Sequence, residues 1–224
     1  MTRPRVSVLM AACDAERFIG EALESILSQT HPVHEVIVVD DGSTDATSQI
    51  AQGFGHPVRV LTGPHAGIGT ARNRAMDEAS GELWAWLDAD DRWHQPKLAR
   101  QVALLERRPD LDAVFTLVDE FEDPTASAGH RQPGQRLSGP LVSSLLLRAE
   151  AGRRVGPFDP GATSGDWIDW WSRAVDAGLA HAEVPEVLVD RRLHDRNHSA
   201  QAERNAQEYL RVLRARLQRQ RAAP

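Results

Sequence analysis

The most informative segment of this chain is Glu35-Val36-Ile37-Val38-Val39-Asp40-Asp41-Gly42-Ser43-Thr44-Asp45. Its apolar, β-branched run is typical of a strand buried on both faces of a parallel sheet. The polar remainder has the composition of a turn that leads into a helix, with Ser43 or Thr44 as the expected helix cap. The segment therefore predicts an α/β domain and places two carboxylates at the carboxyl end of a strand.

Strands and helices alternate on both sides of this segment. Further strands are expected at residues 6–10, 58–61, 83–87 and 113–118, and further helices at residues 16–29, 70–79 and 96–107. Such alternation predicts a mostly parallel sheet that is covered on both faces by helices.

The second half of the chain has a weaker pattern. Residues 122–139 are rich in proline, glycine, serine and charged residues, as in a long surface loop. After this loop we expect a strand at residues 141–147, a helix at residues 166–177, a strand at residues 187–189 and a helical tail from residue 201.

Composition narrows the possible functions. The 224 residues are 41% hydrophobic and 26% charged, which is typical of one globular domain. A formal net charge of −6 argues against a nucleic-acid partner, and no apolar run approaches the roughly 20 residues of a transmembrane segment. One cysteine excludes an intrachain disulfide. Because the N-terminus lacks the apolar core of a signal peptide, we expect a cytoplasmic protein.

Carboxylates follow three of the expected strands. Asp14 comes after the first, Asp40 and Asp41 after the second, and Asp88-Ala89-Asp90-Asp91 after the fourth. Ligands bind beyond the carboxyl ends of the strands in an open parallel sheet. Carboxylates this close together repel one another unless a cation compensates, and Mg²⁺ or Mn²⁺ favours oxygen ligands shared with substrate phosphates. The sequence therefore predicts a metal–diphosphate site at this edge of the sheet.

Four segments also occur in this order in a known enzyme family: residues 7–10, 35–45, 67–75 and 87–91. They resemble the family 2 glycosyltransferases, closely over residues 5–120 and more weakly to about residue 200. The resemblance implies the GT-A fold, a Rossmann-like and mostly parallel sheet flanked by helices in a single domain. Residues 5–120 would then bind the nucleotide sugar, residues 140–200 would form the acceptor and catalytic half, and residues 201–224 would be a terminal helix.

The resemblance also implies an activity: transfer of a sugar, with inversion, from a nucleoside-diphosphate donor to an acceptor hydroxyl. The expected donor is a UDP-sugar, and the expected acceptor is a small molecule, a glycan or a peptide. Asp41, with Asp40 beside it, is similar to the residue that holds the uracil or ribose, and Arg72 is similar to an arginine near the donor. Asp88 would contact the ribose or a metal-bound water, and Asp90 would bind Mn²⁺ or Mg²⁺.

The first motif departs from the family pattern. Ala11-Ala12-Cys13-Asp14 stands where family members usually have proline, an aromatic residue and asparagine. Asp14 can still accept a hydrogen bond from the nucleotide, but Cys13 cannot stack on a base, and a small buried apolar role is expected for it.

The catalytic base is expected in Gly165-Asp166-Trp167-Ile168-Asp169-Trp170-Trp171. This segment resembles the family's Gly-Glu-Asp-Trp motif, with Asp166 in the place of the glutamate and Trp167 in the place of the aspartate. Asp166 and Asp169 share a helix face, and we favour Asp166 as the base. The alternative for Asp166 is that it is a cap or first-turn charge of the helix. Aromatic residues at helical spacing usually belong to the core, so we expect core positions for the tryptophans, with a stacking surface for a sugar as the alternative.

The last strand leads into Arg191-Arg192-Leu193-His194. This segment resembles a position where GT-A enzymes keep a histidine metal ligand or basic contacts to the diphosphate. We therefore expect Arg191 and Arg192 to contact the diphosphate and His194 to bind the metal. His65 and His94 are expected to be ordinary surface histidines.

Two other functions fit the same sequence. A sugar-phosphate nucleotidyltransferase would have a similar sheet, but it usually carries a glycine-rich loop after the first strand, and residues 11–16 contain no glycine. A catalytically degenerate protein that binds a nucleotide sugar is the non-enzymatic alternative, and the altered motifs at Asp14 and Asp166 favour it.

Overall fold

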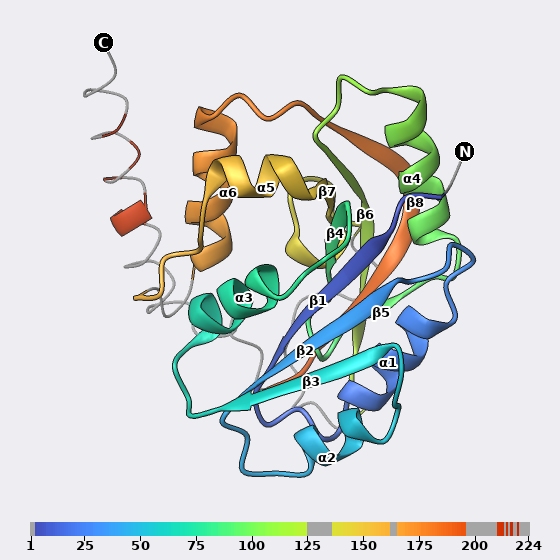
Figure 1. Ribbon diagram of the computed structural model, residues 1–224, viewed down its shortest axis with the longest axis vertical. Coiled ribbons are helices and arrows are strands. Elements are labelled where there is room, and N and C mark those ends of the chain that lie inside the picture. Colours follow the sequence, from blue (N-terminus) through green and yellow to red (C-terminus); the bar gives the residue numbers. More distant parts are fainter. Residues whose placement is uncertain are drawn as a thin grey trace.

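An eight-stranded sheet in the order β3-β2-β1-β4-β7-β6-β8-β5 forms the centre of the computed structural model (Figure 1). The structure describes residues 3–124, 136–161, 165–195, 210–212, 214, 216 and 219. The strands are β1 (Val6–Ala12), β2 (Glu35–Asp41), β3 (Val58–Gly63), β4 (Leu83–Trp86), β5 (Arg92–Trp93), β6 (Ala113–Glu122), β7 (Leu146–Arg148) and β8 (His181–Leu193).

The first four long strands are parallel, as the alternating sequence predicts. Val8 on β1 pairs with Val36 on β2 and with Ala85 on β4, and Val36 pairs in turn with Val58 on β3. Because all four strands run the same way, their carboxyl ends meet at one edge. The loops that carry the acidic residues therefore start from the same edge of the sheet.

The second half adds antiparallel pairs. Strand β7 pairs antiparallel with both β4 and β6, and β5 pairs antiparallel with β8, whereas β6 and β8 are parallel. The strand expected at residues 141–147 is largely wrong: a 3-10 turn, η1 (Val142–Ser144), comes first, and only Leu146–Arg148 is a strand. Ser144 explains the turn, because its N–H and its hydroxyl both donate to the carbonyl of Leu141 and so compete with strand pairing.

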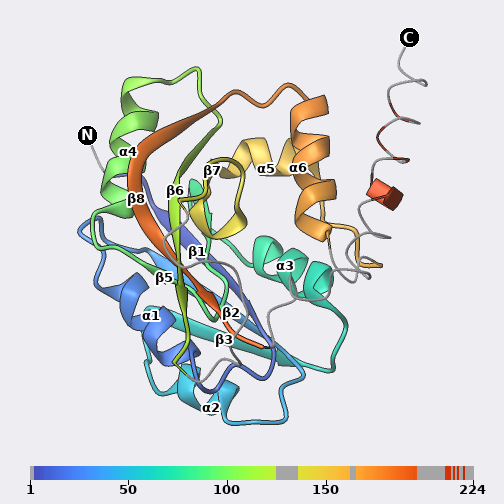
Figure 2. The same ribbon diagram turned by 180° about the vertical axis from the view of Figure 1, so that it is seen from behind.

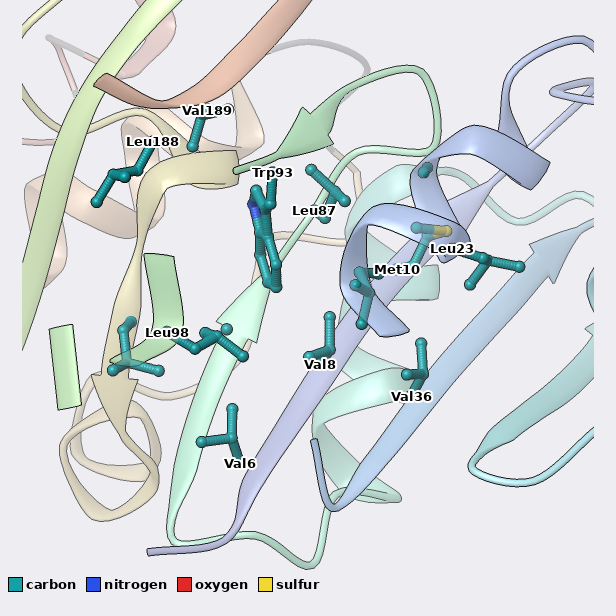
Figure 3. Packing of buried hydrophobic residues seen from close by; sticks show 14 of the residues in the cluster. Val6, Val8, Met10, Leu23, Val36, Leu87, Trp93, Leu98, Leu188 and Val189 are labelled. Carbon is teal, nitrogen blue, oxygen red and sulfur yellow. The ribbon is translucent and has the colours of Figure 1, made fainter. Parts of the chain in front are cut away.

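Helices cover both faces of the sheet (Figures 1 and 2). They are α1 (Ile19–Leu27), α2 (Thr47–Gln52), α3 (Ile68–Asp77), α4 (Lys97–Arg107), α5 (Ala149–Val155) and α6 (Asp166–Asp176). Alternate residues of β1 divide the core: Val6, Val8 and Met10 pack with α1 and α4, while Leu9 packs with α3 and α6. Figure 3 shows the first of these cores, where Met10 and Leu23 lie beside Val36.

The helix cap expected at Ser43 or Thr44 is wrong. Helix α2 begins at Thr47, and the carboxylate of Asp45 accepts the N–H of that residue at 2.9 Å. Ser43 and Thr44 instead bind Asp14 in the neighbouring loop. Their hydrogen-bonding groups therefore join two loops instead of starting a helix.

The expected terminal helix is described at six positions, all of them helical. Arg211 pairs with Asp159 at 2.7 Å, and Arg216 and Arg219 each lie 3.4 Å from Asp176. The rest of residues 201–224, and residues 125–135 of the expected loop, lie outside the described residues. Within the described part of the chain, no helix is long and apolar enough to cross a membrane.

Candidate active site

Asp14 joins the loops that follow β1 and β2. Its Oδ1 accepts the N–H of Thr44 at 2.7 Å, and its own N–H donates to Oγ of Ser43 at 3.0 Å. Asp14 adopts the left-handed region, with a φ of +48°, which aspartate tolerates better than most residues do. Cys13 beside it is exposed, whereas the sequence led us to expect a buried residue. Its thiol still loses part of its contact with water, and this desolvation, together with the charge of Asp14, raises the pKa of the thiol.

Asp40 and Asp41 are held by backbone N–H groups. Asp40 Oδ1 accepts from Ser43 at 2.9 Å, within its own turn. The two oxygens of Asp41 accept from Ala66 at 2.8 Å and from Gly67 at 2.9 Å, at the start of α3. The Asp41 carboxylate therefore ties the end of β2 to the loop that follows β3.

His65 lies against Asp41, which the sequence did not indicate. Its side chain is 70% exposed, as expected of a surface histidine, yet Nδ1 lies 3.0 Å from Oδ2 of Asp41. A Cβ on Gly42 would lie 2.6 Å from the backbone nitrogen of His65, so only glycine fits between the two loops. His94 likewise has a partner, with Nε2 at 2.8 Å from Oδ1 of Asp190.

Arg72 on α3 joins the two halves of the site. One terminal nitrogen lies 3.0 Å from Oδ1 of Asp88, and the other binds the carboxylate of Asp166 on α6. Arg72 and Asp166 are both buried. Burial alone would lower the pKa of the Arg72 guanidinium, but the charges of Asp166 and Asp88 outweigh it and raise this pKa. Arg72 is therefore a permanent cation between two carboxylates from different halves of the chain.

Asp90 and His194 form the pair that fits a divalent cation. Nε2 of His194 lies 2.9 Å from Oδ2 of Asp90. Two adjacent ligands of an octahedral Mg²⁺ or Mn²⁺ ion lie about 3 Å apart, so the pair can serve as neighbouring ligands. Within the described residues, no group of three or more histidine, cysteine or acidic side chains forms a metal cage. Substrate oxygens and water would have to supply the remaining ligands, as is usual for Mg²⁺ at phosphate sites.

Asp91 is a buried carboxylate whose role the sequence left open. Its two oxygens accept from the Ser143 hydroxyl at 2.7 Å and from the backbone N–H of Arg192 at 3.0 Å. Burial, with the like charges of Asp90 and Asp88, raises the pKa of Asp91 well above its ordinary value. Asp91 therefore connects the acidic loop to β8 and η1.

The two arginines expected at the diphosphate both have carboxylate partners. Arg191 lies 2.8 Å from Glu120, whose side chain is fully buried. Arg192 is itself buried and binds Glu21 and Asp123. These contacts give Arg192 a structural role, and the predicted diphosphate contact of either arginine stays a prediction.

The two candidate bases on α6 have different surroundings. Asp166 is the first residue of the helix, directly after Gly165, and its carboxylate is bound by Arg72. Asp169 pairs with Arg173 at 3.0 Å and with Arg219 at 3.5 Å. Asp166 is also the more buried of the two carboxylates. Of this pair, only Asp166 is linked through Arg72 to Asp88.

The three tryptophans of α6 belong largely to the core. Trp170 and Trp171 are buried, and Trp167 stacks on both of them with ring centroids 5.6 and 5.9 Å away. Trp167 is partly exposed and donates its ring N–H to the carbonyl of Pro140 at 2.6 Å. Trp167 therefore lies at the edge of the aromatic core.

Comparison with known sequences finds glycosyltransferases. The family model described as glycosyl transferase family 2 matches residues 7–160. An uncharacterized glycosyltransferase of Rickettsia typhi is 28% identical over 92% of this chain and 69% of its own length. Glycosyltransferase AglE of Haloferax volcanii is 31% identical over 84% of this chain and 66% of its own length. The chain thus spans about two thirds of these relatives.

Solved structures share the fold. TarS of S. aureus, solved with UDP-GlcNAc, superimposes with a TM-score of 0.74 at 20% identity, over 88% of this chain and 61% of TarS 1–349. Mannosyltransferase PcManGT of Pyrobaculum calidifontis, solved with GDP-Man and Mn²⁺, gives a TM-score of 0.72 at 23% identity, over 97% of this chain and 65% of its own. The predicted GT-A fold, with a mostly parallel sheet between helices, is confirmed.

Several residues around the site have no sequence signal. Glu21 lies on α1, Glu120 on β6, and Asp123 just beyond β6, yet all three bind arginines at the end of β8. Glu21 is separated from Arg192 by 171 residues of chain. No motif spans such distances, so only the folded structure brings these charges together.

Proposed function

Because the chain belongs to glycosyl transferase family 2, we propose that it transfers a sugar, with inversion, from a nucleoside-diphosphate donor to an acceptor hydroxyl. The carrying observation is the position of Arg72, which binds Asp88 from the loop after β4 and Asp166 from α6. Such a displacement requires the donor phosphates and the acceptor to be held close together, and one guanidinium here reaches both sides of the site. In this proposal, residues 5–120 hold the donor and residues 140–200 the acceptor.

The donor's base and ribose bind at the ends of β1 and β2. Asp14, Asp40 and Asp41 supply carboxylate oxygens there, and each such oxygen can accept further hydrogen bonds beyond those it makes in the protein. The neighbour TarS was solved with UDP-GlcNAc and the neighbour PcManGT with GDP-Man, so both are nucleotide-sugar complexes. A UDP-sugar is the donor that we propose for this chain.

Asp90 and His194 would hold Mn²⁺ or Mg²⁺. Their 2.9 Å separation supports a shared ion, and PcManGT was solved with Mn²⁺. A bound divalent ion supplies charge that stabilises the diphosphate as it leaves. Asp88, beside Arg72, would contact the ribose or a water molecule on that ion.

Asp166 is the proposed base. The acceptor oxygen forms a bond to the anomeric carbon while the bond from that carbon to the diphosphate oxygen breaks. The hydroxyl proton passes to the Asp166 carboxylate, and the nucleoside diphosphate leaves with the bonding electrons. Arg72 binds the Asp166 carboxylate and so fixes its position. The acceptor hydroxyl becomes more acidic as its oxygen attacks the anomeric carbon, which favours transfer of its proton late in the step.

The activity is tested on the purified chain with Mn²⁺ and no acceptor. We expect UDP-sugars to raise the melting temperature and to be slowly hydrolysed to UDP; a ligand at 100 times its Kd contributes about 2.7 kcal/mol to stability. Asp90→Asn should abolish the dependence on Mn²⁺ and most of the hydrolysis while the melting temperature of the free protein is retained. Neither stabilisation nor hydrolysis with any UDP- or GDP-sugar would contradict the proposal.

A nucleotide-sugar-binding protein without turnover is the second candidate. The observation that favours it is that the Asp166 carboxylate is already buried against Arg72. This candidate predicts stabilisation by donor sugars, with no release of UDP and no transfer to any acceptor.

A further inference from the structure

The side chain of Arg192 lies behind the acidic loop of the site. Its Nε donates to the backbone carbonyl of Asp90 at 3.0 Å, and its own backbone N–H donates to Oδ1 of Asp91 at 3.0 Å. One residue of β8 therefore holds two successive residues of the loop. Through the carbonyl of Asp90, it fixes the backbone from which the proposed metal ligand extends.

The guanidinium of Arg192 is itself held from several sides. It pairs with Glu21 and with Asp123, and its central carbon lies 4.9 Å from the centre of the Phe18 ring and 4.6 Å from that of Phe121. The Arg192 side chain is only 8% exposed. A planar cation between two rings and two carboxylates has little freedom to rotate.

The same surroundings extend to His194. The rings of Phe18 and His194 lie 4.7 Å apart at a tilt of 38°, so Phe18 contacts both residues. Arg192 lies on β8 and His194 directly follows the end of this strand, and Phe18 packs against both side chains. The orientation of the imidazole and that of the Asp90 loop thus depend on one packed unit.

We propose that Arg192 is a positioning residue that keeps Asp90 and His194 at the separation a divalent cation requires, by clamping the Asp90 carbonyl against the end of β8. This inference rests on the proposed function, because the cation belongs to the proposed donor site. It gives Arg192 a role different from the diphosphate contact that the sequence led us to expect. Groups that orient metal ligands usually contribute about 10- to 100-fold to metal affinity.

Arg92 is a matched control. It also pairs with Glu21, at 2.7 Å, and also lies over Phe121, at 4.3 Å, while its Nε binds Asp190 at 2.8 Å. None of these contacts reaches the carbonyl of Asp90. Comparing Arg192→Gln with Arg92→Gln therefore separates the clamp on the loop from the loss of a charge beside Glu21 and Phe121.

The first experiment measures Mn²⁺ binding to the full chain in the presence of UDP, and UDP binding in EDTA. Arg192→Gln should weaken Mn²⁺ binding about tenfold or more and leave metal-free UDP binding unchanged, whereas Arg92→Gln should change neither more than about twofold. Equal Mn²⁺ affinity in wild type and folded Arg192→Gln would overturn the inference. Weaker UDP binding in EDTA would also overturn it, because that result identifies a diphosphate contact.

A second experiment needs no ligand. Backbone hydrogen exchange in the metal-free protein should rise about tenfold in peptides that contain residues 88–93 and 190–195 of Arg192→Gln, and not in those of Arg92→Gln. Unchanged exchange in residues 88–93 would refute the clamp even if the proposed transferase function fails. Failure of wild type to bind UDP or Mn²⁺ would refute the proposed function alone. Should Arg192→Gln not fold, Arg192→Lys keeps a cation beside Asp123 but lacks the Nε donor to Asp90, and the same outcomes apply to it.

Discussion

The carboxylates of the donor-side loops and those of the ion-pair cluster are held in different ways. The donor-side loops contain Asp14, Asp40 and Asp41, and backbone N–H groups donate to all three carboxylates. The ion-pair cluster contains Asp88, Asp166 and Asp123, whose partners include the guanidinium groups of Arg72 and Arg192. Backbone donors are present whatever the neighbouring side chains are. Guanidinium donors disappear with a single substitution.

This difference predicts unequal tolerance of mutation. A carboxylate held by N–H groups can be replaced by an amide, because the amide oxygen still accepts a hydrogen bond. An arginine between buried carboxylates cannot be replaced by an apolar residue, because the remaining charges then repel one another without compensation. We therefore expect the donor-side loops to tolerate such substitutions, whereas the stability of the ion-pair cluster depends on charge balance.

Arg72→Met should give the largest loss of stability. The substitution leaves Asp88 and Asp166 without their shared cation, and breaking a buried ion pair costs about 3–5 kcal/mol. Asp14→Asn is the matched change in the donor-side loops: its oxygen still accepts from Thr44, so it should cost less than about 1 kcal/mol. Urea unfolding of both variants measures the difference. If the two substitutions lower the free energy of unfolding by similar amounts, the two regions do not differ in their tolerance of mutation.

Asp166→Asn should give the largest loss of activity within a folded protein. A base that loses its proton acceptor should slow transfer by a factor on the order of 100 or more. The amide keeps the shape and an oxygen for Arg72, so donor binding should stay within about twofold of wild type. Asp169→Asn is the control, because Asp169 pairs with Arg173 on its own helix. If Asp166→Asn retains full transfer and Asp169→Asn loses it, the base is Asp169, one turn further along α6.

Asp41→Ala should have a smaller effect, confined to the donor. Loss of a charge-assisted hydrogen bond, worth about 1.5–3 kcal/mol, should raise the Kd for UDP-sugar by roughly tenfold or more. Asp40→Ala should matter less, because the Asp40 carboxylate turns back onto the N–H of Ser43. Calorimetric titration of both variants tests the order. If Asp41→Ala leaves the donor affinity unchanged, the nucleotide does not bind at the end of β2.

The donor half of the molecule was predictable from the sequence because its signals are local. Apolar runs followed by polar turns identify β1 to β4, and the acidic loops come directly after the strands that position them. The strand expected at residues 141–147 failed because the Ser144 hydroxyl binds the nearby carbonyl of Leu141, which a hydrophobicity pattern does not register. The contact of His65 was also missed, because its partner, Asp41, lies at the end of β2 and not in the same loop.

The family, the alternation of strands and helices, and the loops that carry carboxylates all follow from the amino-acid sequence alone. These features depend on side-chain periodicity and turn chemistry, which act over a few residues. The pairing of individual charged side chains, by contrast, depends on how the chain folds in three dimensions. Arg72 pairs with a carboxylate 94 residues away, and Arg192 with one 171 residues away. Burial makes such pairing obligatory without specifying the partner, because an ionised group in the interior requires a compensating charge from whichever element packs beside it.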